Sequence, residues 1–343
     1  MGETYEAAGV SIAAGDEAVQ RIKASVRSTY RPEVIGDIGS FGGLFAFDPT
    51  KYRHPVLVSS TDGVGTKAQV ATRVGRFDTI GLDLVAMCVD DLVCQGAEPL
   101  FFLDYLSVGK LDPDHAAALV AGVAEGCRLA GCALIGGEMA EHPGVMAPGE
   151  FDLVGFAVGV VERDAVITGE TVTPGDALIG MPSPNLRSNG FSLARRVLFD
   201  VAGRGVDEPA FPGSPRTLGD ELLDPSVIYA PAVLAVRDAV DLRAVAHITG
   251  GGIPGNLARV LPDSVDAVVD RGSWEPPPIF GEIQRLGSIG DDEMAKVFNL
   301  GLGMILVVPA SEAATAVEVL AGHGHAARIV GEVAAGSGTV RLD

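Results

Sequence analysis

The sequence predicts an α/β chain, with α+β features, that folds as two domains. Apolar strand-like runs alternate with amphipathic helical segments in both halves. The length of 343 residues suits two domains of ordinary size. A boundary is expected near 165–175, where Thr173-Pro174-Gly175-Asp176 makes a turn before the next strand. We therefore expect domains at 1–170 and 171–343, the first with a mixed sheet and helices, the second with a sheet flanked by helices.

The spacing of apolar residues predicts the helices and strands of the first half. Val19, Ile22 and Val26 recur at helical intervals, and Gly131 is a natural stop for an alanine-rich helix. A glycine-rich loop is expected at 36–47. The predicted first-half elements are helices at 16–30, 78–95 and 113–131 and strands at 55–60, 100–107, 133–135 and 152–161.

The second half continues the alternation. Three prolines in 275–278 suggest a stiff connector. The predicted second-half elements are strands at 177–180, 243–248, 265–270 and 303–308 and helices at 191–199, 226–239, 255–261 and 311–322.

Composition excludes several classes of function. Net charge is −20, which argues against nucleic-acid or anionic-membrane binding but leaves room for phosphate ligands held by a few cations. No apolar run has the length of a membrane helix, and the N-terminus lacks a basic-then-apolar signal, so we expect a cytoplasmic protein. The four cysteines lie in apolar surroundings, which favours reduced core thiols over a metal site; they are Cys88, Cys94, Cys127 and Cys132.

The most informative motif is 59–67, which reads SSTDGVGTK after an apolar run. Its glycines permit close backbone approach, Asp62 suits Mg²⁺, and Lys67 offers a point charge to phosphate. The order of residues is not that of a Walker A loop. A nucleotide-phosphate site and an ordinary turn with a solvated lysine are about equally compatible with this segment alone.

Paired carboxylates form a second motif. Asp90 and Asp91 interrupt an apolar helix, where their repulsion would be relieved by a bound Mg²⁺; the alternative is that both face solvent. The segment 136–141, reading GGEMAE, follows a predicted strand, and Glu138 could complete a metal shell. An exposed acidic turn is an equally good interpretation of that segment.

Three polar segments lie in the second half. Residues 250–255, GGGIPG, match a dinucleotide fingerprint, but Pro254 falls where its helix should begin, so a phosphate-binding loop is favoured. His247, at a strand end, is a catalytic candidate, although a lone histidine is more often structural. Residues 185–190, NLRSNG, suit anion binding or the capping of a helix by Ser188 or Asn189.

Taken together, the motifs resemble the phosphoribosylformylglycinamidine cyclo-ligase (AIR synthetase) family of purine biosynthesis. The matching segments are in order and span nearly the whole chain; they are 8–12 (AGVSI), 31–34 (RPEV), 39–45 (GSFGGLF), 61–67 (TDGVGTK), 96–105 (GAEPLFFLDY), 136–138 (GGE), 188–190 (SNG), 247–252 (HITGGG) and 298–301 (FNLG).

The resemblance implies a homodimer formed through the N-terminal domain, with ATP and Mg²⁺ as cofactors. It implies conversion of formylglycinamidine ribonucleotide and ATP into aminoimidazole ribonucleotide, ADP and phosphate. ATP would phosphorylate the formyl oxygen, and the amidine nitrogen would then close the ring. The N-terminal domain would bind ATP and Mg²⁺, and the C-terminal domain would contribute to the substrate cleft.

The resemblance also implies roles for individual residues. Catalytic candidates are Asp62, Asp91 and His247. Metal candidates are Asp62, Asp90, Asp91 and Glu138. ATP-binding candidates are Lys23, Gly42, Gly43, Asp62, Gly63, Thr66, Lys67, Thr79 and Gly137. Substrate-binding candidates are Arg187, Ser188, Asn189, Gly190, Thr249 and Gly250.

The chain departs from the expected family pattern at a few positions. Asp90 stands where Asn is usual, and Arg187 stands where His is usual, which puts a catalytic role there in doubt although Arg suits a substrate phosphate. Met139 and His142 replace Thr and Met after Glu138. Alternative functions are another ATP-using enzyme of the superfamily (a small-molecule kinase or a carbamoyl-dehydrating maturation factor), a noncatalytic nucleotide-binding regulatory subunit, and an NAD-dependent oxidoreductase built on 250–255.

Overall fold

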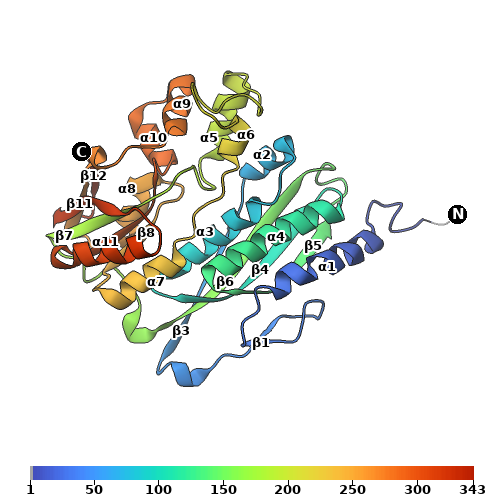
Figure 1. The fold of residues 1–343 in the computed structure, drawn as a ribbon, viewed down its shortest axis with the longest axis horizontal. Helices are drawn as coiled ribbons and strands as arrows, with labels where there is room; N and C mark the ends of the chain where they lie inside the picture. The colour runs from blue at the N-terminus through green and yellow to red at the C-terminus, as the bar shows by residue number, and fades with distance from the viewer. Residues whose placement is uncertain (1–2) are drawn as a thin grey trace.

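Two large sheets organise the chain in the computed structural model, which describes residues 3–343 (Figure 1). The N-terminal Met1 and Gly2 considered above lie outside the described residues. A four-stranded sheet has the order β3-β6-β4-β5, and a six-stranded sheet the order β12-β9-β11-β7-β10-β8. The chain is thus a two-sheet α/β structure, as the sequence predicts.

The elements of the first half supply the four-stranded sheet, its helices and a small hairpin. The strands are β1 (Val34–Ile35), β2 (Leu44–Phe45), β3 (Pro55–Gly63), β4 (Glu98–Val108), β5 (Ala133–Glu141) and β6 (Phe151–Glu162). The helices are α1 (Ile12–Arg27), α2 (Lys67–Val74), α3 (Ile80–Cys94) and α4 (Pro113–Ala130).

The second half supplies the six-stranded sheet. Its strands are β7 (Asp176–Pro182), β8 (Ala244–His247), β9 (Val265–Val269), β10 (Leu302–Pro309), β11 (Arg328–Ala335) and β12 (Val340–Leu342). Its helices are α5 (Phe191–Arg195), α6 (Leu218–Leu222), α7 (Ala230–Ala239), α8 (Gly252–Leu257), α9 (Pro278–Gly287), α10 (Asp291–Val297) and α11 (Ala313–Gly322), with a π-helical segment at Arg196–Val201.

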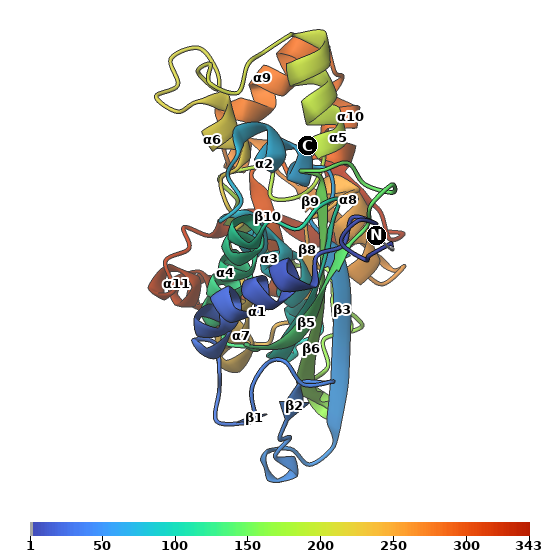
Figure 2. The same ribbon diagram turned by 90° about the vertical axis from the view of Figure 1, so that its right-hand side faces the viewer.

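The four-stranded sheet is mixed, as predicted, because β4 and β5 run parallel while β3–β6 and β4–β6 are antiparallel. Helices α1, α3 and α4 cover one face, as Figure 2 shows. The other face carries three exposed apolar side chains, Leu57, Tyr105 and Phe156, each on a different strand. Sheets with antiparallel strands commonly bury one face and expose the other to solvent. Three large apolar side chains on the solvent-exposed face are nevertheless unusual.

Helix α3 joins the two halves. It packs on β3, β4 and β6 and also contacts β8 and α7 of the second half. All but three of its residues are buried, because its apolar side chains face both neighbours. One apolar core therefore continues from the first sheet through α3 into the second half, and a second core lies on the other side of the six-stranded sheet.

Several predicted boundaries shift for local reasons. Helix α1 begins at Ile12 rather than residue 16, because the Ser11 hydroxyl accepts a hydrogen bond from the Ala14 amide and caps it. Helix α4 ends as predicted, with Gly131 at φ 74°. Strand β5 runs to Glu141 rather than stopping at 135, since it pairs with β4 along its whole length. The prediction missed seven helices and strands, α2, α6, α9, α10, β1, β11 and β12.

Within residues 3–343, no helix combines the length and the apolar character needed to cross a membrane.

Candidate active site

Asp62 and Asp91 meet where the first half faces the second. Asp62 lies near the end of β3, and Asp91 lies on the last turns of α3. The Asp91 carboxylate accepts hydrogen bonds from the Ser60 hydroxyl at 3.0 Å and from Nδ1 of His247 at 2.8 Å. The structure thus brings together three predicted catalytic residues from segments that are far apart in the sequence.

Asp62 lacks a compensating cation. Its side chain accepts a hydrogen bond from the Gly63 amide at 2.7 Å, and no ion pair to it forms within residues 3–343. Burial, with a contribution from the charge of Asp91, raises the pKa of Asp62. Two neighbouring carboxylates in a partly buried position are the donor chemistry that Mg²⁺ takes, so the residues fit such an ion.

Asp90 does not belong to that pair, which corrects its prediction as a metal ligand. Asp90 is fully buried. One carboxylate oxygen lies 2.7 Å from Nη2 of Arg187, and the other accepts from the Tyr229 amide at 2.9 Å. Its charge is therefore neutralised inside the protein, and it has no free oxygen to offer a metal.

Glu138 also lies apart from Asp62. Asp62 pairs with Gly155, which pairs with Asp104, which pairs with Gly137, so β3 and β5 form opposite edges of the sheet. Three strand spacings separate the edges by ~14 Å. Among the described residues no cluster of three metal-binding side chains occurs. The predicted set of four ligands therefore does not assemble within one chain.

Lys67 is buried rather than solvated, which corrects the expectation that it contacts phosphate. It opens helix α2, and its ammonium lies 2.6 Å from the Asp83 carboxylate. It also donates to the carbonyls of Arg187 and Asp224, at 3.1 and 3.0 Å. Burial lowers the pKa of Lys67 and raises that of Asp83, and their mutual attraction opposes both shifts. Its contacts fasten the second half to the first.

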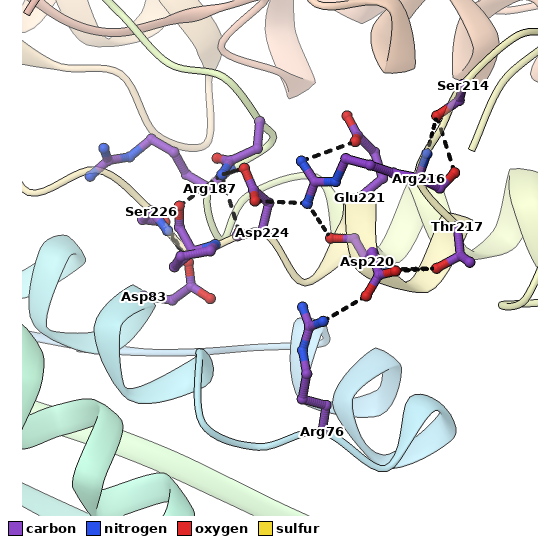
Figure 3. A network of polar contacts seen from close by, with 12 residues as sticks. Arg76, Asp83, Arg187, Ser214, Arg216, Thr217, Asp220, Glu221, Asp224 and Ser226 are labelled. Carbon is purple, nitrogen blue, oxygen red and sulfur yellow. Dashed lines mark hydrogen bonds and ion pairs between the residues drawn. The ribbon is translucent and has the colours of Figure 1, made fainter. Parts of the chain in front are cut away.

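A polar network continues this fastening. Asp83 accepts from the amide and the hydroxyl of Ser226, at 2.9 and 2.5 Å. Figure 3 shows Arg76, beside α2, reaching Asp220 of α6, an ion pair of 2.7 Å. Arg216 lies between further carboxylates of the same region, as Figure 3 also shows. Several charged contacts thus hold the two halves in one relative orientation.

The glycine-rich loop lines a separate cavity of about 490 Å³ at the β5 edge. Helix α1 forms an apolar wall, and the opposite side is polar; the lining includes Gly42, Gly43, Gly137 and Glu138. Lys23 follows Ile22 of that wall on α1, with its ammonium 3.1 Å from Gln20. Of the predicted ATP-binding residues, Gly42, Gly43 and Gly137 therefore line one cavity, whereas Lys23 is not part of its lining.

Asp104 is a site residue that the sequence analysis missed. It lines the same cavity, and burial raises its pKa to about 7. A Cβ at Gly137 would lie 1.9 Å from its carboxylate, so the paired glycine makes room for it. The available signal was a single acid within the apolar strand FFLDY.

Thr66 and Thr79, two predicted ATP-binding residues, lie in different parts of the structure. The Thr66 hydroxyl lies 3.1 Å from that of Ser192 on α5, near the end of the motif that contains Asp62 and Gly63. Thr79 precedes α3 at the end remote from Asp91, ~18 Å away along the helix axis. Its hydroxyl is buried and unpaired in the described chain. The structure therefore does not bring Thr79 to the carboxylate pair.

The segments 188–190 and 249–250 lie against each other. The side-chain oxygen Oδ1 of Asn189 accepts a hydrogen bond from the Gly250 amide at 3.1 Å, and the Thr249 hydroxyl donates to Oδ1 of Asn256 at 3.2 Å. Gly190 begins α5 without any side-chain cap, so capping by Ser188 or Asn189, the alternative considered above, does not occur. The Ser188 hydroxyl has no partner in the described chain.

Arg187 is fully buried, which corrects its prediction as a contact to substrate phosphate. Besides Asp90, its guanidinium donates to the Val227 carbonyl at 2.7 Å and lies 4.9 Å from the centre of the Tyr229 ring. The same Nη2 is 3.1 Å from Nε2 of His247. Both ring nitrogens of His247 therefore contact protein groups in this arrangement, and its role as a catalytic residue stays a prediction.

The dinucleotide alternative is also wrong. Strand β8, which precedes residues 250–255, pairs antiparallel with β10 and forms an edge, whereas the fingerprint needs a parallel βαβ unit. Close packing explains the glycine at position 252, because a Cβ there would lie 1.8 Å from the Ala295 carbonyl oxygen.

Comparison with known proteins gives consistent matches. Residues 50–161 match the N-terminal domain, and residues 173–343 the C-terminal domain, of AIR synthase related proteins. A phosphoribosylformylglycinamidine cyclo-ligase of Myxococcus xanthus is 56% identical over 339 residues, covering 98% of each chain. A thiamine-monophosphate kinase structure from Stenotrophomonas maltophilia has a TM-score of 0.70 at 20% identity, covering 95% of this chain and 96% of that one. The structure of hydrogenase maturation protein HypE in complex with ATP has a TM-score of 0.69 at 19% sequence identity, and the match covers 97% of this chain and 92% of that one.

The two solved structures share only the fold at such low identity. The match to the Myxococcus protein instead extends over nearly the whole of both chains, and both domain models are present in order. On these grounds the chain belongs to the phosphoribosylformylglycinamidine cyclo-ligase family.

Proposed function

We propose that this chain catalyses the ATP-dependent closure of formylglycinamidine ribonucleotide to aminoimidazole ribonucleotide, with release of ADP and phosphate. The observation that carries the proposal is the pair of neighbouring carboxylates, Asp62 and Asp91, placed where the two halves meet, of which Asp62 has no cationic partner among residues 3–343. Family membership supports the reaction, because the relatives bear the cyclo-ligase name over nearly the full length. The enzyme is thus a ligase that uses ATP.

Asp62 and Asp91 are the proposed holders of Mg²⁺ on ATP. When bound, the ion would neutralise phosphate charge, which is the main requirement of phosphoryl transfer. The chain's own contribution is to fix the two carboxylates: Ser60 and His247 hold Asp91, and the Gly63 amide holds Asp62. Catalysis then depends on the orientation of these groups rather than on a base.

The ribonucleotide is assigned to the segments 188–190 and 249–250. They lie against each other through Asn189 and Gly250, beside the strand end that carries His247. The Ser188 hydroxyl is buried and has no hydrogen-bond partner among residues 3–343, and a bound polar group beside it would supply one. We propose a division at residue 170, with the ATP and Mg²⁺ groups in 1–170 and the substrate segments in 171–343.

We propose that the enzyme is a homodimer that uses the open face of the four-stranded sheet. Leu57, Tyr105 and Phe156 are exposed there by 65%, 40% and 39%. The edges β3 and β5 each pair with one neighbour within the described chain. A second copy whose β5 edge faces β3 would bring Glu138 of the partner subunit and its glycine-lined cavity towards Asp62. This arrangement would reunite the ligands that one chain separates.

Leu57→Asp tests the dimer. We expect the variant to be monomeric and to lose most activity, because a charge would be placed in an apolar interface. Ile329→Asp is the matched control, because it also replaces an exposed apolar residue with aspartate, on β11, where Ile329 is 53% exposed. It should leave the molecular mass of the dimer unchanged. Light scattering after gel filtration measures both. A monomeric parent protein, or a dimer that tolerates the Leu57 change, would refute the arrangement.

The reaction itself is tested by incubating the protein with Mg·ATP and formylglycinamidine ribonucleotide while measuring both products. One molecule of ADP per aminoimidazole ribonucleotide, with both substrates required, is expected. ADP without the imidazole would indicate another acceptor, as in a superfamily kinase. Binding of ATP with neither product would indicate a regulatory subunit.

We also propose a cytoplasmic location, where the four unpaired thiols would stay reduced.

A further inference from the structure

Two buried charged residues from distant parts of the sequence meet in space. Asp90 and Arg187 are 97 positions apart, yet they form an ion pair of 2.7 Å. Both side chains are completely buried. A buried charge is tolerated only with a well-placed partner, so each of these residues requires the other.

The protein fixes this pair rigidly. Asp90 accepts from the Tyr229 amide, and Arg187 donates to the Val227 carbonyl and lies over the Tyr229 ring. The Arg187 amide in turn donates to Asn185 at 2.9 Å. The guanidinium therefore has one orientation, and its Nη2 is aimed at both Asp90 and His247.

The direction of each hydrogen bond follows from the chemistry of arginine. A guanidinium donates and never accepts, so Nε2 of His247, 3.1 Å from Nη2, must be the unprotonated acceptor. The ring proton is then on Nδ1, which lies 2.8 Å from Asp91 and donates to it. A buried arginine thus selects the histidine tautomer that holds Asp91.

We propose that Arg187 is a positioning residue: held by Asp90, it fixes His247 as the Nδ1–H tautomer, and His247 thereby orients the Asp91 carboxylate. The link to catalysis rests on the proposed function, in which Asp91 holds Mg·ATP. The tautomer itself does not depend on that function. Residues that orient a metal ligand commonly change affinity or activity by about 10- to 100-fold when removed.

Nitrogen-15 NMR of histidine-labelled protein tests the tautomer directly. The chain has six histidines, and a His247→Gln sample identifies the signals that belong to His247. We expect the ring of His247 to carry its proton on Nδ1. A proton on Nε2, or a ring that exchanges freely between tautomers, would overturn the proposal whether or not the protein is a cyclo-ligase.

The paired variant Asp90→Asn/Arg187→Met tests the consequence. It removes both buried charges together, so the fold should persist, while Nε2 loses its donor. We expect kcat to fall about tenfold or more and the Mg²⁺ concentration for half-maximal rate to rise, with KM for the ribonucleotide nearly unchanged. A folded paired variant with the parent kcat and Mg²⁺ dependence would refute the positioning role.

A matched control removes another ion pair. Asp176 and Arg243 lie 2.8 Å apart in the six-stranded sheet, with side chains 5% and 20% exposed. Asp176→Asn/Arg243→Met should lower the melting temperature and leave kcat unchanged. If the Asp90/Arg187 variant fails to fold, His247→Asn and His247→Gln decide the question. The Asn amide can occupy the position of Nδ1 and still donate to Asp91, so it should retain more activity than Gln, and equal activities would contradict the proposal.

Discussion

Asp62→Asn is expected to lower turnover by roughly 100-fold or more, as removal of a preorganised charge in an active site does. The amide keeps the size of the side chain and can still accept from the Gly63 amide. It lacks the negative charge that the proposed Mg²⁺ needs. Because burial and Asp91 raise the pKa of Asp62, the folded protein disfavours this charge, so its loss should not reduce thermal stability.

Asp266→Asn is the contrasting control. Asp266 lies on β9, away from the junction, and accepts from the amides of Ser337 and Thr339, which lowers its pKa. Its loss should reduce stability slightly and leave turnover intact, the opposite of Asp62→Asn. Steady-state rates and melting temperatures of both variants measure the contrast. Full activity of Asp62→Asn would remove Asp62 from the site, and an unfolded variant would make its role structural.

Lys67→Met is expected to lower the free energy of unfolding by about 3–5 kcal/mol, because it leaves the buried Asp83 without its partner. The combined change Lys67→Met/Asp83→Asn should recover most of this loss. The Asn oxygen can still accept from Ser226, and no unpaired charge remains. Urea titration of the parent, of Lys67→Met, of Asp83→Asn and of the combined variant measures the coupling between the two residues.

The same variants separate a structural lysine from a phosphate ligand. The combined variant should keep KM for ATP within about threefold of the parent value. If Lys67 bound a phosphate of ATP instead, its removal would weaken ATP binding and raise KM. An exposed pair, Arg53 with Asp164, offers a control in which Arg53→Met should leave stability unchanged. A stable combined variant that no longer binds ATP would contradict the assignment and restore Lys67 to the phosphate site.

Local signals in the sequence predict much of the fold. The end of α4 at Gly131 was predictable because a left-handed residue there, at φ 74°, favours glycine. The apolar periodicity of 78–95 predicts α3 to within two residues at its start and one at its end. The four cysteines are unpaired, and three are fully buried, as their apolar surroundings predict. These features depend on neighbours in the chain, so a single sequence contains them.

Features that depend on distant contacts were not predictable in the same way. Strand β5 continues through Gly136 and Gly137 because β4 pairs with it, although two glycines normally suggest a loop. Helix α2 is short and follows a glycine motif, so its periodicity is weak, and Lys67 at its start is buried by Asp83 and the second half.

The candidate site likewise combines residues that local motifs predict with contacts that only the folded chain reveals. Asp62, Asp91 and His247 were identified from strand-end and helix motifs, and the structure brings them together. The connection between Asp90 and Arg187 was not visible, because 97 positions separate them and each appeared as an isolated departure. Only the packing of α3 against the second half brings the two residues together.

The most direct test of the proposed site is anomalous diffraction from crystals grown with Mn²⁺ and a non-hydrolysable ATP analogue. Mn²⁺ takes the oxygen ligands that suit Mg²⁺ and can be located by its own signal. We predict a peak between the carboxylates of Asp62 and Asp91, and its loss in Asp62→Asn crystals. A metal bound elsewhere, with both carboxylates free of it, would contradict the assignment of the catalytic centre to the junction of the two halves.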